Sequence, residues 1–271
     1  MAEPARAVDA ASEPPLIALE RVEKRFANGT LAVTGLDLAI GRHEFVSLLG
    51  PSGCGKSTAL RMIAGLGAPT SGRIRWPGHG AGSRPARGEV GFVFQEPTLM
   101  PWARVAANIR RPLALIGVTG AEADRRVAEA LEMVGLAEFA RAFPRELSGG
   151  MRMRVSIARA LATRPKVLLM DEPFAALDEI TRFRLNEDLL DLWRANSWTV
   201  VFVTHSVFES VYLSSRIVVM TGRPGRVHAD VPIEAPYPRS QAFRMTEAYN
   251  GYCRTVSAAL AEAMAAPGGG T

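Results

Sequence analysis

The chain has 271 residues, of which 48% are hydrophobic and 22% are charged, a composition typical of one large globular domain or two modest ones. It has no apolar run of about 18 residues or more, which argues against a transmembrane helix. The N-terminus lacks the basic start and apolar centre of a secretory signal, so we expect a cytoplasmic protein. Cys54 and Cys253, the two cysteines, are too few for a disulfide framework or a zinc site.

The net charge of +5 raises the question of a nucleic-acid partner. Lysine occurs only at positions 24, 56 and 166, so the basic excess is almost entirely arginine. These arginines are scattered along the chain, with no long basic block and no interleaved aromatic series. We therefore expect an ordinary solvated surface and no nucleic-acid partner.

The two ends of the chain have the composition of disordered tails. Residues 1–15 are rich in Ala, Pro and Glu, and residues 263–271 close with "APGGGT". Between the tails, short apolar runs rich in β-branched residues recur at 45–49, 90–94, 167–170, 200–203 and 217–220. Continuous apolar strands are expected where helices cover both faces of a parallel sheet, so the pattern predicts an α/β fold.

A glycine-rich loop follows the first of these strands. The stretch "LLGPSGCGKST" at 48–58 matches G-x-x-x-x-G-K-[ST] from Gly50 to Ser57 and precedes a helical segment. Lys56 would neutralise the β- and γ-phosphates of a nucleotide and Ser57 would bind Mg²⁺. A chance glycine turn is the alternative, but the flanking strand and helix favour a phosphate loop. Its residues are Gly50, Pro51, Ser52, Gly53, Cys54, Gly55, Lys56, Ser57 and Thr58.

Gln95 ends the second strand, in "VGFVFQ", and its amide could contact Mg²⁺ or a hydrolytic water, although alone it is an unremarkable polar residue. From residue 96 to about 163 helical periodicity dominates, which predicts a mainly helical insertion. Within it, Thr119 and Glu122 have capping-box spacing.

A second glycine turn, "LSGGMRMRV" at 147–155, opens a helix inside this insertion. Ser148 and the backbone of Gly149 and Gly150 would form an anion site separate from the phosphate loop. A flexible helix start without a ligand is the alternative.

Acidic and basic side chains end two further strands. In "KVLLMDEP", Asp171 could reach the Mg²⁺ shell while Glu172 points toward the γ-phosphate and an attacking water. His205 ends "VVFVTH", where a lone histidine is more often structural. A third polar strand end at a phosphate-binding edge favours a functional role.

With these motifs in this order, residues 16–225 resemble the ATP-binding subunits of ABC transporters. "LSGGM" is similar to that family's signature sequence and "FAALDEITR" at 174–182 to its D-loop. The resemblance implies a P-loop NTPase (RecA-like) α/β core, an N-terminal antiparallel β subdomain and an inserted helical subdomain at about 96–163. It also implies a homodimer that closes around two ATP molecules, in which Ser148, Gly149 and Gly150 meet the γ-phosphate bound by the other subunit.

The same resemblance assigns roles to single residues. It makes Phe26 the aromatic that stacks on adenine, with a core or strand-edge phenylalanine as the alternative. Asp178 would communicate across the dimer, His205 would sense the γ-phosphate, and Glu172 would polarise the water or accept its proton. Mg²⁺ would be held by Ser57, Gln95 and Asp171. The family pattern is broken at Met151, Met153 and Ser206, none of which is a phosphate or metal ligand, so we expect an active enzyme.

The resemblance further implies an integral-membrane permease that rests in a groove near Gln95, lined by Met100, Pro101 and Trp102, with core packing as the alternative. The motifs "VFQEPTLMPW", "LSGGM" and "THSVFES" are similar to the importer branch for nitrate, sulfonates, taurine and thiamine-pyrimidine precursors. An extracytoplasmic solute-binding protein would deliver the solute, and this subunit would lie on the cytoplasmic face of the inner membrane.

Three other ATPase classes lack support in the sequence. A chromosome or DNA-repair ATPase would carry a long coiled coil or zinc-binding cysteines, and a translation-associated ATPase would carry two cassettes. A small-molecule P-loop kinase would lack the LSGGM and D-loop pair. Residues 226–262 stay outside the motifs and are expected to form an edge hairpin and a closing helix.

Overall fold

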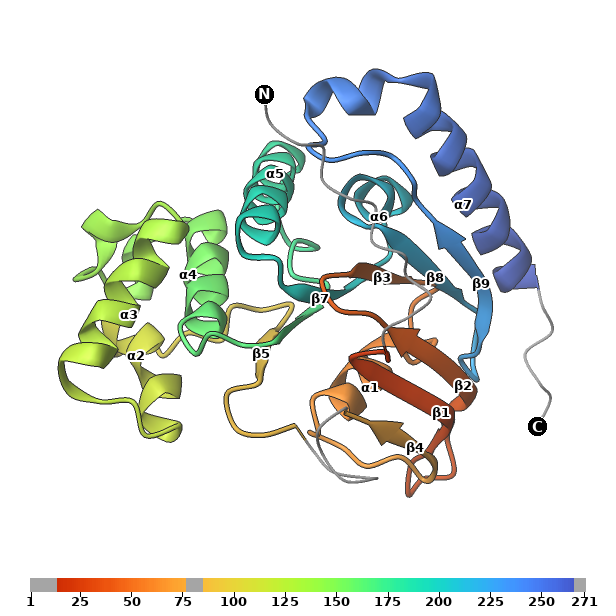
Figure 1. The fold of residues 1–271 in the computed structure, drawn as a ribbon, viewed down its shortest axis with the longest axis horizontal. Coiled ribbons are helices and arrows are strands. Elements are labelled where there is room, and N and C mark those ends of the chain that lie inside the picture. Colours follow the sequence, from red (N-terminus) through yellow and green to blue (C-terminus); the bar gives the residue numbers. More distant parts are fainter. Residues whose placement is uncertain (1–13, 77–84, 266–271) are drawn as a thin grey trace.

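The computed structural model describes residues 14–76 and 85–265. Its centre is a six-stranded sheet in the order β5-β6-β7-β3-β8-β9 (Figure 1). Five strands are parallel and the edge strand β9 pairs antiparallel with β8. The bounds are β3 Phe45–Leu49, β5 Val90–Val93, β6 Val167–Asp171, β7 Thr199–Thr204, β8 Arg216–Met220 and β9 Val227–Pro232.

The five apolar runs of the sequence coincide with β3, β5, β6, β7 and β8, so their prediction as parallel strands is confirmed. Every residue of β3, β6 and β7 is buried, as expected for central strands covered on both faces. The helices that cover them include α1 Lys56–Ile63, α5 Glu179–Asn196 and α6 Val207–Leu213.

A second, antiparallel sheet lies beside the core in the order β2-β1-β4 (Figure 1). Its strands are β1 Ile17–Arg25, β2 Leu31–Ile40 and β4 Ser71–Arg75. The second half of β2 alternates between buried and exposed residues, because one face of this sheet packs on the core while the other meets solvent. This sheet is the N-terminal β subdomain that the resemblance implied.

The helical insertion stands to one side of the central sheet (Figure 1). It contains α2 Val105–Leu115, α3 Gly120–Met133 and α4 Gly149–Leu161, with short 3-10 turns at Ala137–Phe139 and Pro144–Glu146. The expected capping box at its α3 helix is absent. Thr119 occupies the N-cap position but its side chain makes no capping hydrogen bond. Glu122 instead binds Arg125 and Arg126, because two guanidinium groups compete better for a carboxylate than a backbone N–H.

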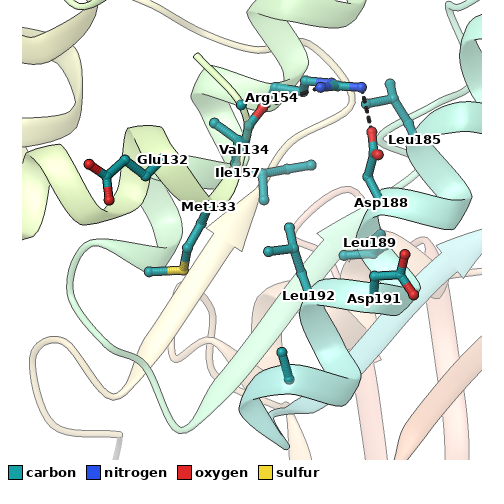
Figure 2. A pocket seen from close by; sticks show the side chains of 12 residues that line it. Glu132, Met133, Val134, Arg154, Ile157, Leu185, Asp188, Leu189, Asp191 and Leu192 are labelled. Carbon is teal, nitrogen blue, oxygen red and sulfur yellow. Dashed lines mark hydrogen bonds and ion pairs between the residues drawn. The ribbon is translucent and has the colours of Figure 1, made fainter. Parts of the chain in front are cut away.

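A cleft of about 450 Å³ separates the insertion from the core (Figure 2). Its apolar wall includes Ile157 of α4 and Leu189 of α5, and Figure 2 shows both side chains in the space between the two helices. The Arg154 guanidinium on α4 binds the Asp188 carboxylate on α5 across this cleft. The insertion is therefore joined to the core by an ion pair as well as by apolar packing.

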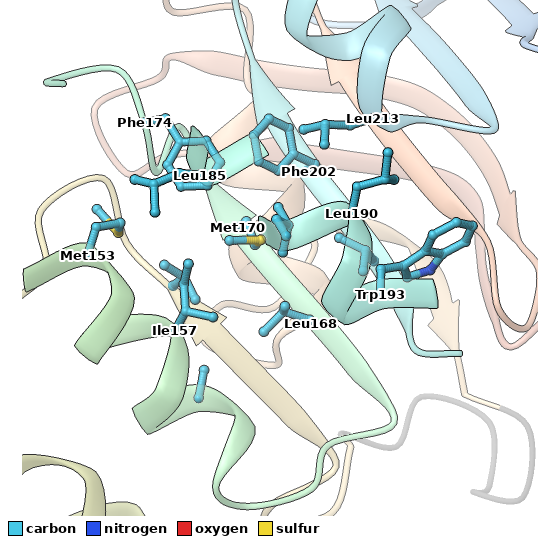
Figure 3. Packing of buried hydrophobic residues seen from close by; sticks show 14 of the residues in the cluster. Met153, Ile157, Leu168, Met170, Phe174, Leu185, Leu190, Trp193, Phe202 and Leu213 are labelled. Atoms are coloured by element: carbon cyan, nitrogen blue, oxygen red, sulfur yellow. The ribbon is translucent and has the colours of Figure 1, made fainter. Parts of the chain in front are cut away.

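Side chains of α4 and α5 pack with those of β6 and β7 in one hydrophobic cluster (Figure 3). Phe174 and Phe202 lie with ring centroids 5.9 Å apart, and Phe45 packs edge-to-face on Trp193 at 5.7 Å. Met153 of α4 points toward the same cluster in Figure 3 and is almost fully buried. Helix α4 thus packs in the same core as β6 and β7.

The C-terminal segment continues from β9 through a 3-10 turn at Gln241–Met245 into α7 Glu247–Ala265, which packs on α6 and β8. Arg239 fastens this segment, since its buried guanidinium donates to the carbonyls of Val211, Tyr212, Ser214, Ile233 and Ala235. The predicted start of the C-terminal tail, at residue 263, is too early in the chain. Helix α7 continues to Ala265, and Ala263 is fully buried because that face of the helix packs on the core.

The expected N-terminal tail lies almost entirely outside the described residues, as does the chain beyond 265. Within residues 14–76 and 85–265, no helix combines the length and apolarity needed to cross a bilayer.

Candidate nucleotide-binding site

Three neighbouring strands deliver the predicted site residues to one edge of the sheet. β6, β7 and β3 are adjacent and parallel, so the segments that follow them emerge at the same, carboxyl-terminal edge. Gly50 follows β3, Glu172 follows β6 and His205 follows β7. Residues more than a hundred positions apart in sequence therefore meet in one place.

The phosphate loop closes around its own lysine. Gly55 has φ 98°, in the left-handed region, and a Cβ there would lie 2.7 Å from the Ala32 carbonyl oxygen, so only glycine fits. Lys56 begins α1, and its buried ammonium donates to the carbonyls of Gly50 at 2.7 Å and Pro51 at 3.0 Å. A cation at the N-terminal end of a helix, wrapped by backbone, is the arrangement that receives a phosphate.

Cys54 is part of the loop but offers no chemistry. Its side chain is 1% exposed, and burial raises the pKa of its thiol. A thiol held protonated in an apolar environment is a poor nucleophile and metal ligand. The side chain packs in the core under the antiparallel sheet.

Ser57 and Asp171 come together at the centre of the site. Ser57 Oγ donates a hydrogen bond of 2.7 Å to Asp171 Oδ1. Burial raises the pKa of the Asp171 carboxyl, and the Ser57 hydrogen bond opposes that rise. A hydroxyl and a carboxylate oxygen at this spacing are the hard oxygen ligands that Mg²⁺ prefers, so these two residues fit a magnesium site.

Glu172 and His205 form a second pair. Glu172 has φ 46°, and its backbone N–H donates to the Val203 carbonyl at 3.0 Å, which turns the chain sharply after β6. His205 Nδ1 lies 3.3 Å from Glu172 Oε2. The His205 side chain is 54% exposed, compared with 21% for Glu172, so the histidine faces the open side of the pair.

A cavity of about 240 Å³ is lined by one member of each pair, Ser57 and Glu172, while Asp171 and His205 are not among its lining residues. Phe26, from the segment after β1, stands at one wall with its ring 44% exposed, available to stack on a flat ligand. Lys56 and Glu172 also line the cavity. The full lining is Phe26, Thr30, Ala32, Ser52, Gly53, Gly55, Lys56, Ser57, Thr58, Glu172 and Arg223.

Arg223 is a charged lining residue that the sequence did not single out. It lies in the turn after β8, and its Nε donates to the Gly53 carbonyl at 3.2 Å. Arg223 belongs to no motif and does not end a strand. Its contact with Gly53 could not be predicted, because the contact depends on how the β8-β9 turn packs on the phosphate loop.

The signature turn and the D-loop lie outside this cavity and pack on each other. Ser148 is exposed and caps α4 by accepting the Met151 N–H, while Asp178 caps α5 by accepting the Thr181 N–H at 2.9 Å. A Cβ on Gly150 would lie 2.7 Å from Thr181 Cγ2, so this glycine lets the two helix starts approach each other. Gly149 beside it is half-buried.

Gln95 is exposed just after β5 and is not among the residues that line the cavity. The segment that follows it is held rigidly. Arg159 donates to the carbonyls of Pro97 and Thr98, and the buried Asn108 amide bonds both the N–H and the carbonyl of Met100. Trp102, next to this anchored stretch, is 75% exposed.

A phosphate loop, a serine–aspartate pair and a glutamate–histidine pair at the edge of a parallel sheet define a P-loop ATPase. A family profile described as "ABC transporter" matches residues 33–175. The chain belongs to the ATP-binding subunits of ABC transporters, and its enzyme class is ATPase.

Relatives support this assignment. The chain is 47% identical over 214 residues to an uncharacterized ABC transporter ATP-binding protein of Methanocaldococcus jannaschii, covering 79% of each chain. It is 44% identical over 225 residues to the aliphatic sulfonates import ATP-binding protein SsuB of Bacillus licheniformis, covering 81% of this chain and 85% of that one.

Solved structures share the fold. CbiO1 of Clostridium perfringens, described as part of an ABC transporter complex, matches with a TM-score of 0.73 at 28% identity, covering 82% of this chain and 90% of that one. A dimeric post-hydrolysis state of the ATP-binding cassette MJ0796, bound to ADP and Pi, matches with a TM-score of 0.70 at 33% identity, covering 81% of this chain and 100% of that one.

Proposed function

We propose that this chain powers an ABC importer: two copies close around two ATP molecules, and their opening and closing drives a membrane permease for a small solute. The observation that carries the proposal is the separation of Ser148 from the cavity of its own subunit, since Ser148 is exposed while the phosphate loop lies elsewhere. An exposed helix start that resembles an ATP-contacting signature needs a phosphate from another copy.

In this mechanism the chain's own residues bind and orient the nucleotide. Phe26 stacks on the adenine, Lys56 and the loop N–H groups hold the phosphates, and Glu172 orients the water and accepts its proton. His205, whose Nδ1 lies 3.3 Å from Glu172 Oε2, senses the γ-phosphate. Ser57 and Asp171, with Gln95, would hold Mg²⁺, which supplies charge neutralisation for the phosphates when bound.

The dimer is tested with Glu172→Gln, which removes the proton acceptor and keeps the shape of the side chain. Light scattering of this variant with ATP and Mg²⁺ should give the mass of a dimer, and the same sample with ADP should give a monomer. A matched variant, Glu172→Gln with Ser148→Arg, places a bulky cation in the signature turn and should stay monomeric. A monomer in every sample, with and without the permease, would contradict the ATP sandwich.

Trp102 is the proposed contact with the permease, because a rigidly anchored and exposed tryptophan suits a partner helix. Affinity purification of the tagged chain from gently solubilised native membranes should recover a multi-spanning permease. Trp102→Ala should lose this permease, while Leu66→Ala, at a residue of similar exposure, should keep it. Recovery of nucleic acid or soluble proteins alone would leave an ATPase without a transport function.

The solute is proposed from the relatives and the motifs. The SsuB relatives are described as importing aliphatic sulfonates. Nitrate, taurine and thiamine-pyrimidine precursors are the other solutes of the importer branch that the motifs of this chain resemble. The extracytoplasmic solute-binding protein selects the solute, and this subunit works from the cytoplasmic face of the inner membrane. Once the permease is identified, binding of a sulfonate to its companion binding protein tests this choice.

A further inference from the structure

The turn between β8 and β9 forms part of the wall of the nucleotide cavity. The Gly225 N–H donates to the Ala32 carbonyl at 2.9 Å, and the Thr34 N–H donates to the Gly225 carbonyl at 3.1 Å, which ties the turn to β2. A Cβ on Gly225 would lie 2.0 Å from the Cys54 carbonyl oxygen. The turn is therefore pressed directly against the phosphate loop, with no room for a side chain at this position.

Within the turn, hydrogen bonds hold the backbone on which Arg223 is carried. The Thr221 N–H donates to the Arg226 carbonyl at 2.9 Å, and Thr221 Oγ1 accepts from the Arg226 N–H and donates to the Pro224 carbonyl. These bonds involve the backbone of Arg226 and leave its exposed side chain free of any role in the turn. The side chain of Arg223 is thus carried by a backbone that hydrogen bonds hold in place.

The Arg223 guanidinium lies along the phosphate loop. Its Nε donates to the Gly53 carbonyl at 3.2 Å, and a Cβ on Gly53 would lie only 2.9 Å from its Nη2. The one hydrogen bond described for this side chain uses Nε, so both terminal nitrogens remain available. Among the described lining residues, Arg223 and Lys56 are the cations.

The two cations differ in what they can do before a ligand arrives. Lys56 is buried and already bonds two carbonyls of its own loop, whereas Arg223 is exposed and has two unused donor groups. A guanidinium held through Nε presents its terminal nitrogens as a planar fork, the geometry that matches two phosphate oxygens. Its position beside Gly53 places that fork next to the loop that cradles phosphates.

We propose that Arg223 is a phosphate-binding residue of the nucleotide site, supplied by the β8-β9 turn as a second cation beside Lys56. The proposal rests on the proposed nucleotide binding at this cavity. The guanidinium contacts the phosphate chain through its terminal nitrogens while Nε keeps its bond to Gly53. The C-terminal half of the chain thereby contributes to nucleotide affinity.

The test compares the affinities of ATP, ADP and adenosine for four full-length proteins: wild type, Arg223→Ala, Arg223→Gln and the matched control Arg226→Ala. Titration calorimetry measures ATP and ADP, and competition measures adenosine. Removing Arg223 should weaken ATP and ADP roughly 10- to 100-fold, the effect of hydrogen bonds to a charged group, and leave adenosine unchanged. Arg226→Ala should match wild type for all three.

Arg223→Gln separates loss of charge from loss of structure, because the glutamine amide can still donate to the Gly53 carbonyl but carries no charge. It should lose the same phosphate-dependent affinity, with the thermal midpoint of the unliganded protein unchanged. ATP affinity equal to wild type in both variants, or an equal loss for ATP and adenosine, would overturn the proposal. A wild-type protein that failed to bind ATP would instead overturn the proposed function.

Discussion

Ser57 Oγ donates to Asp171 Oδ1 at 2.7 Å, which joins the first turn of α1 to the last residue of β6. The two residues are 114 positions apart in the sequence, and the hydrogen bond brings their side-chain oxygens together. Two oxygen groups that suit a magnesium ion are therefore already oriented toward each other. Preorganisation of this kind reduces the free energy that ligand binding must spend on ordering side chains.

Asp171→Asn should abolish most ATPase activity and leave the fold intact. The amide oxygen can still accept the Ser57 hydrogen bond, but the negative charge that attracts Mg²⁺ is lost. We expect the rate to fall by at least roughly 10- to 100-fold, with ATP affinity in EDTA unchanged. Asp188→Asn, at a carboxylate paired with Arg154 away from the cavity, is the control and should hydrolyse ATP as wild type does. Equal rates for Asp171→Asn and wild type would remove Asp171 from the metal site.

Glu172→Gln should lower kcat by roughly 100- to 10,000-fold, the usual contribution of a general base. Binding of ATP should persist, because the phosphate loop and Phe26 are untouched. Single-turnover hydrolysis and equilibrium binding measure the two quantities separately. Glu138→Gln, at an exposed glutamate outside the predicted site, is the matched control and should keep the wild-type rate. A Glu172→Gln enzyme with nearly full activity would mean that another group accepts the proton.

Gly150→Ala should destabilise the protein by about 1–3 kcal/mol, because the new methyl group meets Thr181 Cγ2 at 2.7 Å. Thr181→Ser removes that Cγ2 atom and should recover most of the loss in the double variant. Gly149→Ala, whose Cβ would lie 3.3 Å from Leu177 Cδ2, should cost less. Urea unfolding of the four variants measures these differences. Additive effects of Gly150→Ala and Thr181→Ser would show that the clash is not the cause.

The pH dependence of stability should change in Glu209→Gln. Burial raises the pKa of the Glu209 carboxyl, although Thr204, Arg182, Asn186 and His205 around it favour the charged form. The folded state therefore keeps a proton that the unfolded chain releases near a pKa of about 4.3. This contribution to stability is fully present below that value and is lost as the pH rises through the folded pKa.

Glutamine does not titrate, so the stability of wild type relative to Glu209→Gln should decrease from about pH 4 upward. Urea unfolding of both proteins across the range of about pH 4 to 8 measures the difference. Glu138→Gln, the same change at an exposed glutamate of the helical insertion, is the matched control for the general effect of removing a carboxylate. A difference that stayed constant with pH would contradict a raised pKa.

The sequence predicted the central sheet well because buried parallel strands are short, continuous and apolar, as in "FVSLL". It predicted the phosphate loop because glycine spacing and a lysine are written in consecutive positions. Phe26, Lys56 and Glu172 do meet in one cavity. The roles of all the predicted site residues remain predictions, since each depends on a ligand or, for Ser148 and Asp178, on a partner copy.

What the sequence could not supply depends on contacts between distant segments. Arg223 has no local pattern, and its approach to Gly53 follows from the packing of two turns 170 residues apart. The sequence predicts that the Gly150 backbone helps to form an anion site, and the structure adds Thr181 of the same chain as a neighbour that requires a glycine there. The capping box at Thr119 was wrong because local spacing does not reveal that arginines compete for Glu122.

Arg239 joins the C-terminal segment of the chain to α6. Its guanidinium donates to carbonyls at the end of α6 and in the segment after β9. The Tyr249 hydroxyl of α7 donates to the Phe208 carbonyl of α6. Because α6 begins just after His205, these contacts connect the C-terminal helix to the segment that carries that histidine. Helix α7 thereby contributes to the support of the strand end on which His205 lies.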